Sequence, residues 1–280
     1  MANDLRIGIC CGPGSFAPEV KDHAPEPISK LMQTLCASNV DFAEFAVGAV
    51  APDEPDRGFD KLLAEISKFP IKVEAYNSFI PAKYPLTGPR ADQKAALDYC
   101  RRALPRCRAL GGEIVVLGSS GARKFPPDFP RATAEAQFID FCRELAPIAE
   151  RNALTIALEP LNAAEDNLCV SVAHGARIVD AVAHPRFQLL ADMYHIDANK
   201  ESYADVFAAG ARLVHIHVAD VGRAAPGFGF PGEENFIGLF KILRALDYSG
   251  RLSFEGKFDD LHAQAGPLAS FLRKRWQQSS

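Results

Sequence analysis

The sequence predicts an α/β fold, a closed (β/α)8 TIM barrel that forms a single domain over residues 1–280. Short apolar runs of strand length alternate with amphipathic segments of helical spacing along the whole chain. Eight such pairs fill the 280 residues, about 35 residues each, and no linker rich in proline, glycine or serine divides the chain. Unbroken alternation indicates a parallel sheet, and eight repeats favour closure of that sheet into a barrel.

The main alternative is an open, doubly wound sheet. Such a sheet usually carries a glycine-rich phosphate-binding turn after its first strand. The segment CCGPGSF, residues 10–16, has only a G-x-G pattern there, without a third glycine. We therefore interpret this segment as a turn and prefer the barrel.

The first four strand–helix pairs rest on apolar runs followed by helical periodicity. The helix at 59–69 places its leucines, Ile66 and Phe69 on one face, and the helix at 91–112 ends in a double glycine. The expected strands are residues 5–11, 41–50, 71–79 and 113–120. The expected helices are residues 28–38, 59–69, 91–112 and 133–152.

The last four pairs follow the same pattern. Their strands are short runs rich in leucine, isoleucine, valine and phenylalanine, and the helix at 235–250 stops at Gly250. The expected strands are residues 153–161, 187–195, 211–220 and 251–258. The expected helices are residues 172–184, 203–210, 235–250 and 266–276.

Composition narrows the class of protein. Hydrophobic residues make up 48% of the chain, enough for a sizeable core, and charged residues make up 24%, as in soluble globular proteins. The formal net charge is −4, from 31 Lys plus Arg against 35 Asp plus Glu. Because this balance gives no overall attraction to a phosphate backbone, we expect no nucleic-acid partner.

Cysteine usage and the start of the chain bear on the compartment. The seven cysteines are an odd number, and MANDLRIGICC lacks the basic start and long apolar run of a secretory signal. We therefore expect reduced cysteines in a cytoplasmic protein. No apolar run approaches the ~18 residues of a membrane span, so no membrane partner is expected.

Four polar residues stand where the last four expected strands end. Strand five ends at Glu159 and strand six at Asp192; strand seven ends at His217 and strand eight at Glu255. In a barrel the chemistry gathers at the carboxyl ends of the strands. Side chains alternate along a strand, and the residue before each of the four is apolar and suited to the helix-packed outer face. The four polar side chains are thus expected to converge at the barrel mouth.

Three converging carboxylates would repel one another, and some would stay protonated without a cation. A divalent metal ion removes this problem. Three oxygen ligands and one imidazole suit Mn²⁺, Mg²⁺, Co²⁺ or Zn²⁺. A lone acid at a strand end is often a helix cap or a salt-bridge partner, but four in register on consecutive strands favour a metal site.

Five segments resemble the xylose isomerase-like TIM-barrel superfamily, in its sugar isomerase/epimerase branch. They are EPLNAAE, ADMYH, HIHVADVGR, GFG and YSGRLSFEG, between residues 159 and 256. That branch includes ketose 3-epimerases, inosose dehydratases and hydroxypyruvate isomerases. The resemblance implies that the four strand-end residues bind the metal and that Glu159 and Glu255 act as acid and base.

The resemblance also implies three substrate-binding residues. Glu165 stands six residues after Glu159, where ketose epimerases keep a substrate-binding acid. His195 completes their D-x-x-H pattern, and Arg223 occupies the place of an arginine that binds substrate oxygens. For Glu165, a solvated loop acid is the alternative.

Three further residues are candidates for substrate contacts. Asn77 ends strand three, and Arg123 follows strand four, although a structural salt bridge is an equal expectation for Arg123. Lys257 follows a Glu–Gly pair, where similar epimerases often have Glu–Pro. This difference leaves the identity of the substrate undetermined. His215 is expected to be a core histidine. The pair Cys10–Cys11 replaces an aromatic near strand one, and we expect it to pack in the core.

The sequence thus predicts metal-assisted proton transfer on a small sugar or keto-polyol. One glutamate removes a proton next to a carbonyl, an enediolate forms, and the other glutamate returns a proton. His195 and Arg223 would donate hydrogen bonds to the developing negative oxygen. A homodimer or homotetramer is expected.

Three alternatives remain open at this point. The same site would act as a dehydratase or lyase on an inosose or a 3-keto sugar if a hydroxyl group left. A DNA repair enzyme like endonuclease IV would need about twice as many histidine and acidic ligands for its three zinc ions. A non-catalytic sugar-binding protein on this scaffold would be expected to have lost a ligand.

Overall fold

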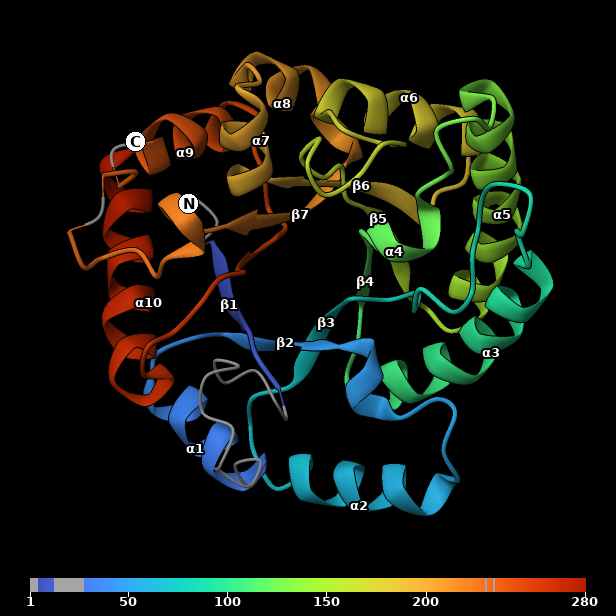
Figure 1. Ribbon diagram of the computed structural model, residues 1–280. Coiled ribbons are helices and arrows are strands. Elements are labelled where there is room, and N and C mark those ends of the chain that lie inside the picture. The colour runs from blue at the N-terminus through green and yellow to red at the C-terminus, as the bar shows by residue number, and fades with distance from the viewer. Residues whose placement is uncertain (1–4, 13–27, 230, 234) are drawn as a thin grey trace.

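The computed structural model describes residues 5–12, 28–229, 231–233 and 235–280. Eight parallel strands form a closed barrel in sequence order, and helices surround it (Figure 1). The strands are β1 Arg6–Cys10, β2 Phe42–Ala46, β3 Val73–Asn77, β4 Ile114–Leu117, β5 Thr155–Leu158, β6 Phe187–Asp192, β7 Leu213–Val218 and β8 Arg251–Phe254. The predicted fold is therefore confirmed, and the open-sheet alternative is wrong. Of its G-x-G segment, 12–14, only Gly12 lies within the described residues.

The ring closes because the first strand pairs with the last. In that pairing Arg6 stands opposite Arg251, and Ile9 stands opposite Phe254. A closed ring leaves no unpaired sheet edge. It also brings the carboxyl ends of all eight strands to one rim of the barrel, and a site there can draw on every strand.

Helices cover the outside of the ring, as expected from the alternation (Figure 1). They are α1 Ile28–Ala37, α2 Asp56–Ile66, α3 Gln93–Ala109, α5 Arg131–Arg151, α6 Val172–Val182, α8 Tyr203–Ala209, α9 Asn235–Ala245 and α10 Leu261–Gln278. Further helical segments, beyond one helix for each strand, are α4 Ser120–Arg123, α7 Met193–Asn199, η1 Val47–Val50, η2 Gly210–Arg212 and η3 Val221–Arg223.

The strands are shorter than the apolar runs suggested. The run at 41–50 ends as a strand at Ala46, and Val47–Val50 form a turn of 3-10 helix. The run at 187–195 ends as a strand at Asp192, and the next residues begin α7. In both places a hydrophobic segment continues past the sheet, because it packs against the helical layer and not only in the barrel.

Strand side chains divide between two cores. A small cluster, Phe42, Ala75, Ile114, Val116, Ala157 and Leu190, fills the barrel interior. A much larger cluster joins the outer faces of the strands to the helices. It includes the four apolar neighbours of the strand-end residues, Leu158, Ala191, Ile216 and Phe254. Because successive strand residues face opposite ways, the polar strand-end residues face inward.

The amino-terminal end of the barrel is closed by charged side chains, which we call the floor cluster: Arg6, Glu74, Glu113 and Arg251. Glu74 accepts hydrogen bonds from Arg6 Nη2 at 2.7 Å and from Arg251 Nε at 2.8 Å. Arg251 also pairs with Glu113 at 2.6 Å. These contacts link β1, β3 and β8 at the end opposite the rim, where they serve stability.

Among the described residues, the search for a helix long and apolar enough to cross a membrane finds none.

Candidate active site

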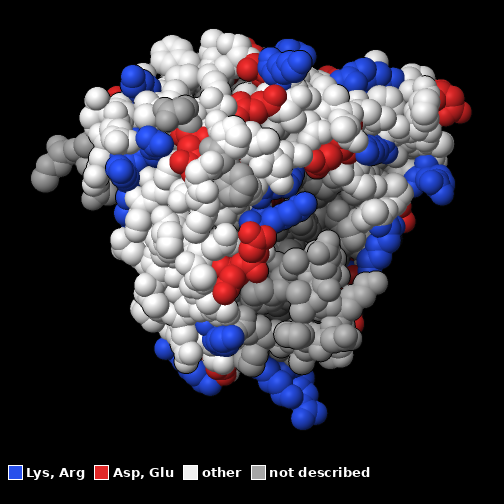
Figure 2. All heavy atoms as spheres, turned by 60° about the vertical axis from the view of Figure 1, so that its left-hand side comes forward, with Lys and Arg blue, Asp and Glu red and all other residues white. Residues whose placement is uncertain are grey.

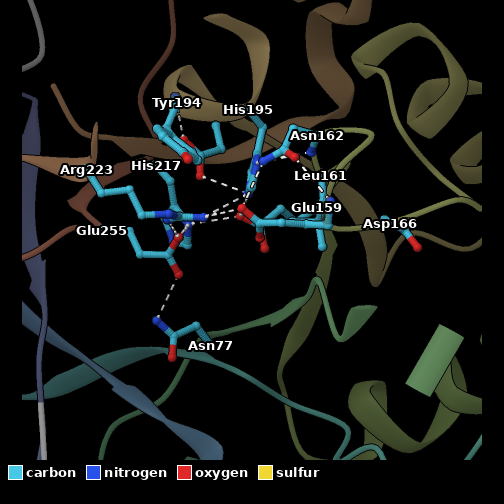
Figure 3. A network of polar contacts seen from close by, with 12 residues as sticks. Asn77, Glu159, Leu161, Asn162, Asp166, Tyr194, His195, His217, Arg223 and Glu255 are labelled. Atoms are coloured by element: carbon cyan, nitrogen blue, oxygen red, sulfur yellow. Dashed lines mark hydrogen bonds and ion pairs between the residues drawn. The ribbon is translucent and has the colours of Figure 1, made fainter. Parts of the chain in front are cut away.

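The four strand-end residues come together at the rim of the barrel. Asp192 is the last residue of β6 and His217 is the last but one of β7, while Glu159 and Glu255 directly follow β5 and β8. One ligand atom from each lies within 4.8 Å of the others. His217 Nδ1 is 3.4 Å from Glu159 Oε1 and 3.7 Å from Glu255 Oε2. Figure 3 shows Glu159, His217 and Glu255 pointing into one shared space.

Three of the four residues present an atom to this space that has no hydrogen-bond partner. Glu159 Oε1, Asp192 Oδ2 and His217 Nδ1 are all buried and make no hydrogen bond. A buried polar atom left unpaired costs roughly 1–3 kcal/mol, and a charged one costs more. Three carboxylate oxygens and one imidazole nitrogen suit a divalent cation that prefers oxygen. The residues present therefore fit a metal ion.

The three carboxylates differ in how readily they hold a proton. Burial raises the pKa of Glu255 to about 7. It also raises the pKa of Asp192, and the charge on Glu159 adds to that shift. Burial acts in the same direction on Glu159, but the imidazole of His217, with Nδ1 3.4 Å from Glu159 Oε1, outweighs it and lowers the pKa. Without a metal ion, Glu159 is thus the most acidic of the three, which gives the two glutamates unequal proton affinity.

Glu44, which the sequence analysis did not select, orients the histidine ligand. Its side chain on β2 is fully buried in the barrel and accepts from His217 Nε2 at 2.9 Å and His215 Nε2 at 2.8 Å. Burial would raise the pKa of Glu44, but the two imidazoles outweigh it and hold the pKa well below its usual range. With Nε2 bonded to Glu44, His217 turns Nδ1 toward the carboxylates. A carboxylate behind a histidine ligand is a common support in metal sites.

His215 is the buried core histidine that the sequence predicts, since it is 0% exposed and bonded to Glu44. The sequence signal for Glu44 is an acid inside the apolar run FAEFA. An acid in such a run needs a partner inside the protein, and the two histidines of β7 supply it.

The D-x-x-H pattern is one turn of helix rather than strand. Asp192 caps α7 through Oδ1, which accepts from Tyr194 N at 2.8 Å, and so its Oδ2 is left to face the site. His195 Nε2 lies 3.6 Å from Asp192 Oδ2 and 3.9 Å from Glu159 Oε1. His195 Nδ1 accepts from Asn162 N at 3.0 Å, which places the proton of a neutral ring on Nε2; the approach of Arg223 Nη2 to Nε2 at 3.3 Å is then a contact and not a hydrogen bond. His195 therefore presents an N–H group to the site.

Arg223 lies across the mouth of the site. Its Nη1 donates to Glu255 Oε2 at 2.8 Å, and its Nη2 lies 3.6 Å from Glu165 Oε1. The guanidinium stacks 4.2 Å from the centre of the Tyr194 ring. Its backbone has a φ of 64°, in the left-handed region that non-glycine residues seldom adopt. This conformation is held in part by Lys257 N, which donates to Arg223 O at 2.7 Å.

Asn77 and Glu165 complete the rim. Asn77 Nδ2 donates to Glu255 Oε1 at 3.3 Å, so both oxygens of Glu255 are held by side chains (Figure 3). Glu165 Oε1 accepts from Asn162 Nδ2 at 2.8 Å.

A cavity of about 310 Å³ opens beside Glu159, Glu165 and Glu255, enough for a small sugar. Its lining also includes Ser78, Ile80, Pro81, Gly118, Ser119, Ser120 and Leu161.

Two predicted substrate contacts lie elsewhere. Arg123 is 0% exposed, and its donors are used by Asp166 and by the carbonyl groups of Leu117, Glu159 and Cys169. The expectation that Arg123 binds substrate is therefore wrong; it ties the end of β5 to the loop that follows, through the structural salt bridge that was the alternative. Lys257 is exposed, and it is not among the residues that line the cavity.

The sequence is similar to a known protein family and to enzymes that act on sugars. The sequence profile of the family described as xylose isomerase-like TIM barrel matches residues 35–275. A 3-dehydro-D-guloside 4-epimerase of Escherichia coli (strain K12) is 30% identical over 168 residues, which are 58% of this chain and 63% of that enzyme. An L-ribulose 3-epimerase of Methylomonas sp. (strain DH-1) is 30% identical over 160 residues, which are 56% of this chain and 54% of that enzyme. The matches thus span less than two thirds of the length of these relatives.

Two solved structures share the whole architecture. A 3-keto-D-glucoside 4-epimerase from E. coli, in its apo form, superposes with a TM-score of 0.78 at 23% identity, covering 96% of this chain and 99% of that one. A D-psicose 3-epimerase from Clostridium cellulolyticum H10, solved with D-tagatose, gives 0.78 at 18% identity, covering 98% of each chain. At these identities the likeness shows the fold.

Proposed function

The chain belongs to the xylose isomerase-like TIM-barrel family, and from that premise we propose that it is a metal-dependent sugar isomerase or epimerase. The observation that carries the proposal is the set of buried, unpartnered ligand atoms of Glu159, Asp192 and His217 beside Glu255. Of these four residues, Glu159 and Glu255 line a cavity of about 310 Å³. The two relatives named above each match more than half of this chain, and both are sugar epimerases.

In this proposal Glu159, Asp192, His217 and Glu255 hold one divalent ion, Mn²⁺, Co²⁺, Mg²⁺ or Zn²⁺. Such an ion supplies Lewis-acid stabilisation of negative charge on the substrate oxygens. Glu44 orients His217, while Asn77 and Arg223 fix the two oxygens of Glu255. These supports hold the glutamates in place before substrate arrives, which is what proton transfer over short distances requires.

The two glutamates exchange protons with a small sugar or keto-polyol. In one direction Glu159, kept ionised by His217, removes the proton next to the carbonyl, and an enediolate forms. Glu255 then delivers a proton to the opposite face of the same carbon, which gives epimerisation, or to the neighbouring carbon, which gives isomerisation. The reverse reaction exchanges the two roles.

His195 and Arg223 act on the charge that develops during this transfer. The Nε2–H of His195 and the guanidinium of Arg223 point into the cavity and donate hydrogen bonds to the enediolate oxygens. Glu165, beside Arg223, accepts from a substrate hydroxyl group.

The surface is consistent with a small-molecule partner. On the face in Figure 2, lysine and arginine side chains are interspersed with aspartate and glutamate over the described surface. Mixed charge of this kind does not favour a polyanion such as nucleic acid. Assembly into a homodimer or homotetramer remains a prediction that light scattering of the purified protein would check.

Metal content and hydrogen exchange test the proposal together. We expect about one divalent ion per purified chain, and exchange of a substrate C–H with solvent deuterium for at least one ketose, inosose or 3-keto sugar. In Glu159→Gln and Glu255→Gln the exchange should fall by about 100-fold or more. Glu54→Gln, which changes an exposed glutamate outside the site, is the matched control.

A wild-type chain that stays empty after metal is added, and exchanges no substrate hydrogen, would overturn the proposal. It would leave the non-catalytic sugar-binding protein as the better reading. Exchange accompanied by loss of water from the substrate would instead identify the lyase alternative at the same site.

A further inference from the structure

Cys10 is a half-buried thiol that the proposed reaction does not use. It is the last residue of β1, and its partner in the sheet register is Glu44 on β2. Residues paired in this way on neighbouring strands face the same side of a sheet. Since Glu44 points into the barrel toward its two histidines, Cys10 points inward as well, and its side chain is half-buried.

The thiol stands beside two of the proposed metal ligands. Cys10 Sγ, a nitrogen of His217 and a carboxylate oxygen of Glu255 all lie within 4.8 Å of one another. Nε2 of His217 is engaged by Glu44, which leaves Nδ1 as the available nitrogen. That Nδ1 is fully buried and has no hydrogen-bond partner. The unpartnered Nδ1 of His217 is therefore a second observation, separate from the presence of the thiol, that points to a ligand here.

The two sets of donors differ in chemical softness. Glu159, Asp192 and Glu255 give an oxygen-rich set with His217, which suits ions such as Mn²⁺ and Mg²⁺. Replacing Glu159 and Asp192 by the sulfur of Cys10 gives a set of one sulfur, one nitrogen and one oxygen. Sulfur and imidazole ligands favour thiophilic ions of the Zn²⁺ and Cd²⁺ kind.

We propose that Cys10, His217 and Glu255 form a second binding position for a thiophilic divalent cation. This position shares His217 and Glu255 with the oxygen-rich one, so the two are occupied in turn and not together. On binding, the Cys10 S–H bond breaks, the proton passes to solvent, and the thiolate bonds to the cation. The inference rests on the proposed metal site, because both positions use the same two ligands.

Titration of chelator-stripped protein with Cd²⁺ tests this position. Thiolate–cadmium bonds give a charge-transfer absorption in the ultraviolet, which reads out the sulfur ligand directly. All variants carry Cys36→Ala, since Cys36 is the exposed thiol. Cys11→Ala is the matched control, because Cys11 is buried and its S–H donates to Ile9 O.

We expect the absorption in the Cys36→Ala parent and in the Cys11→Ala control, and its loss in Cys10→Ser. The affinity of Cys10→Ser for Cd²⁺ should be at least about tenfold weaker. Its affinity for Mn²⁺, followed by electron paramagnetic resonance, should stay within about twofold, which also shows that the variant folds. Absorption that persists in Cys10→Ser, or that is lost equally in Cys11→Ala, would overturn the proposal.

Glu159→Gln separates this proposal from the proposed function. It should bind Mn²⁺ more weakly and keep the cadmium absorption, because Glu159 belongs only to the oxygen-rich position. If Glu159→Gln loses both Mn²⁺ binding and the cadmium absorption, Cd²⁺ occupies the oxygen-rich position, and a separate thiolate position is excluded. If the parent binds Cd²⁺ through Cys10 but never binds Mn²⁺, the proposed function fails while the thiolate position stands. Displacement of Mn²⁺ by Cd²⁺ is expected from the shared ligands, and simultaneous binding of both would contradict it.

Discussion

At the scale of single residues, the orientation of His217 depends on one carboxylate, Glu44, that touches no substrate. The hydrogen bond from His217 Nε2 to Glu44 Oε1 is 2.9 Å long and fully buried. It sets which ring nitrogen faces Glu159 and Glu255, and in the proposed metal site it would make that nitrogen a stronger ligand.

Replacing Glu44 by glutamine should weaken metal binding without touching the ligands. Glutamine has a similar size but carries no charge, and it can accept a hydrogen bond through only one of its two terminal atoms. We expect the Mn²⁺ dissociation constant of Glu44→Gln to rise about 10- to 100-fold, measured by electron paramagnetic resonance. Glu54→Gln is again the control, and an unchanged dissociation constant would contradict the supporting role of Glu44.

A second single-residue prediction concerns Gly118 at the end of β4. A methyl group there would lie 2.3 Å from Glu159 Oε2, so Glu159 would have to move. Gly118→Ala should therefore weaken Mn²⁺ binding by at least about tenfold. Gly238→Ala in α9 is the matched control. It meets no atom within 4 Å, and should stabilise the helix by about 0.5–1 kcal/mol.

Both variants are assayed for their melting temperature and for Mn²⁺ affinity. Full Mn²⁺ affinity in Gly118→Ala would show that Glu159 has room to retreat and still bind.

Some residues of the candidate site can be predicted from the sequence, and others cannot. The four strand-end residues are readable because parallel strands must finish at one rim, so position along the chain gives position in space. Glu44 lies in the middle of a strand, and its importance depends on which strand faces it across the interior. Arg123 is misjudged for a related reason, since a cation after a strand has the same pattern whether its partners are buried carbonyl groups or a ligand.

At the scale of elements, the start of α7 determines the shape of the site. The apolar run FQLLADMYH looks like one strand, yet the strand stops at Asp192, whose carboxylate accepts from Tyr194 N and caps a new helix. The helical turn then brings His195 over the site. Asp192 is thus both the helix cap and a proposed metal ligand. The spacing of hydrophobic residues in the sequence does not indicate this double role.

Two substitutions of Asp192 separate these roles. Asn is as good a helix cap as Asp, whereas Ala is a poor one. In the presence of a chelator, Asp192→Ala should lose about 1 kcal/mol of unfolding free energy relative to Asp192→Asn, as measured by urea denaturation. Both should bind Mn²⁺ more weakly than wild type. Equal stability of the two variants would mean that α7 does not need its cap.

At the scale of the whole molecule, the count of strand–helix units was sufficient to predict closure of the barrel. Each unit buries one strand between two neighbours, and the eighth strand finds its second neighbour only in β1. The sequence did not show the floor cluster, because its four residues come from distant segments and each reads as an ordinary surface charge.

Removing the central acid of the floor cluster should destabilise the barrel and spare the site. Glu74→Gln leaves Arg6 and Arg251 without their shared carboxylate. We expect a loss of about 2 kcal/mol, below the 3–5 kcal/mol of a fully buried pair because the Arg6 side chain is 41% exposed. Glu113→Gln, at a side chain that is 49% exposed, should cost less than about 1 kcal/mol.

Urea denaturation measures both losses, and metal content of the folded protein should stay at one ion per chain. A Glu74→Gln variant as stable as wild type would show that the floor cluster does not stabilise the barrel.

The bond between Glu44 and His217 also has a consequence for how the chain is made. The two residues are 173 positions apart, so a ribosome releases the acid long before its histidine partners. Until then Glu44 must stay hydrated, and the first strands cannot pack around it as they do in the finished protein. We therefore expect that the nascent chain forms no stable half-barrel, and that the first strands become native only once the last ones are present.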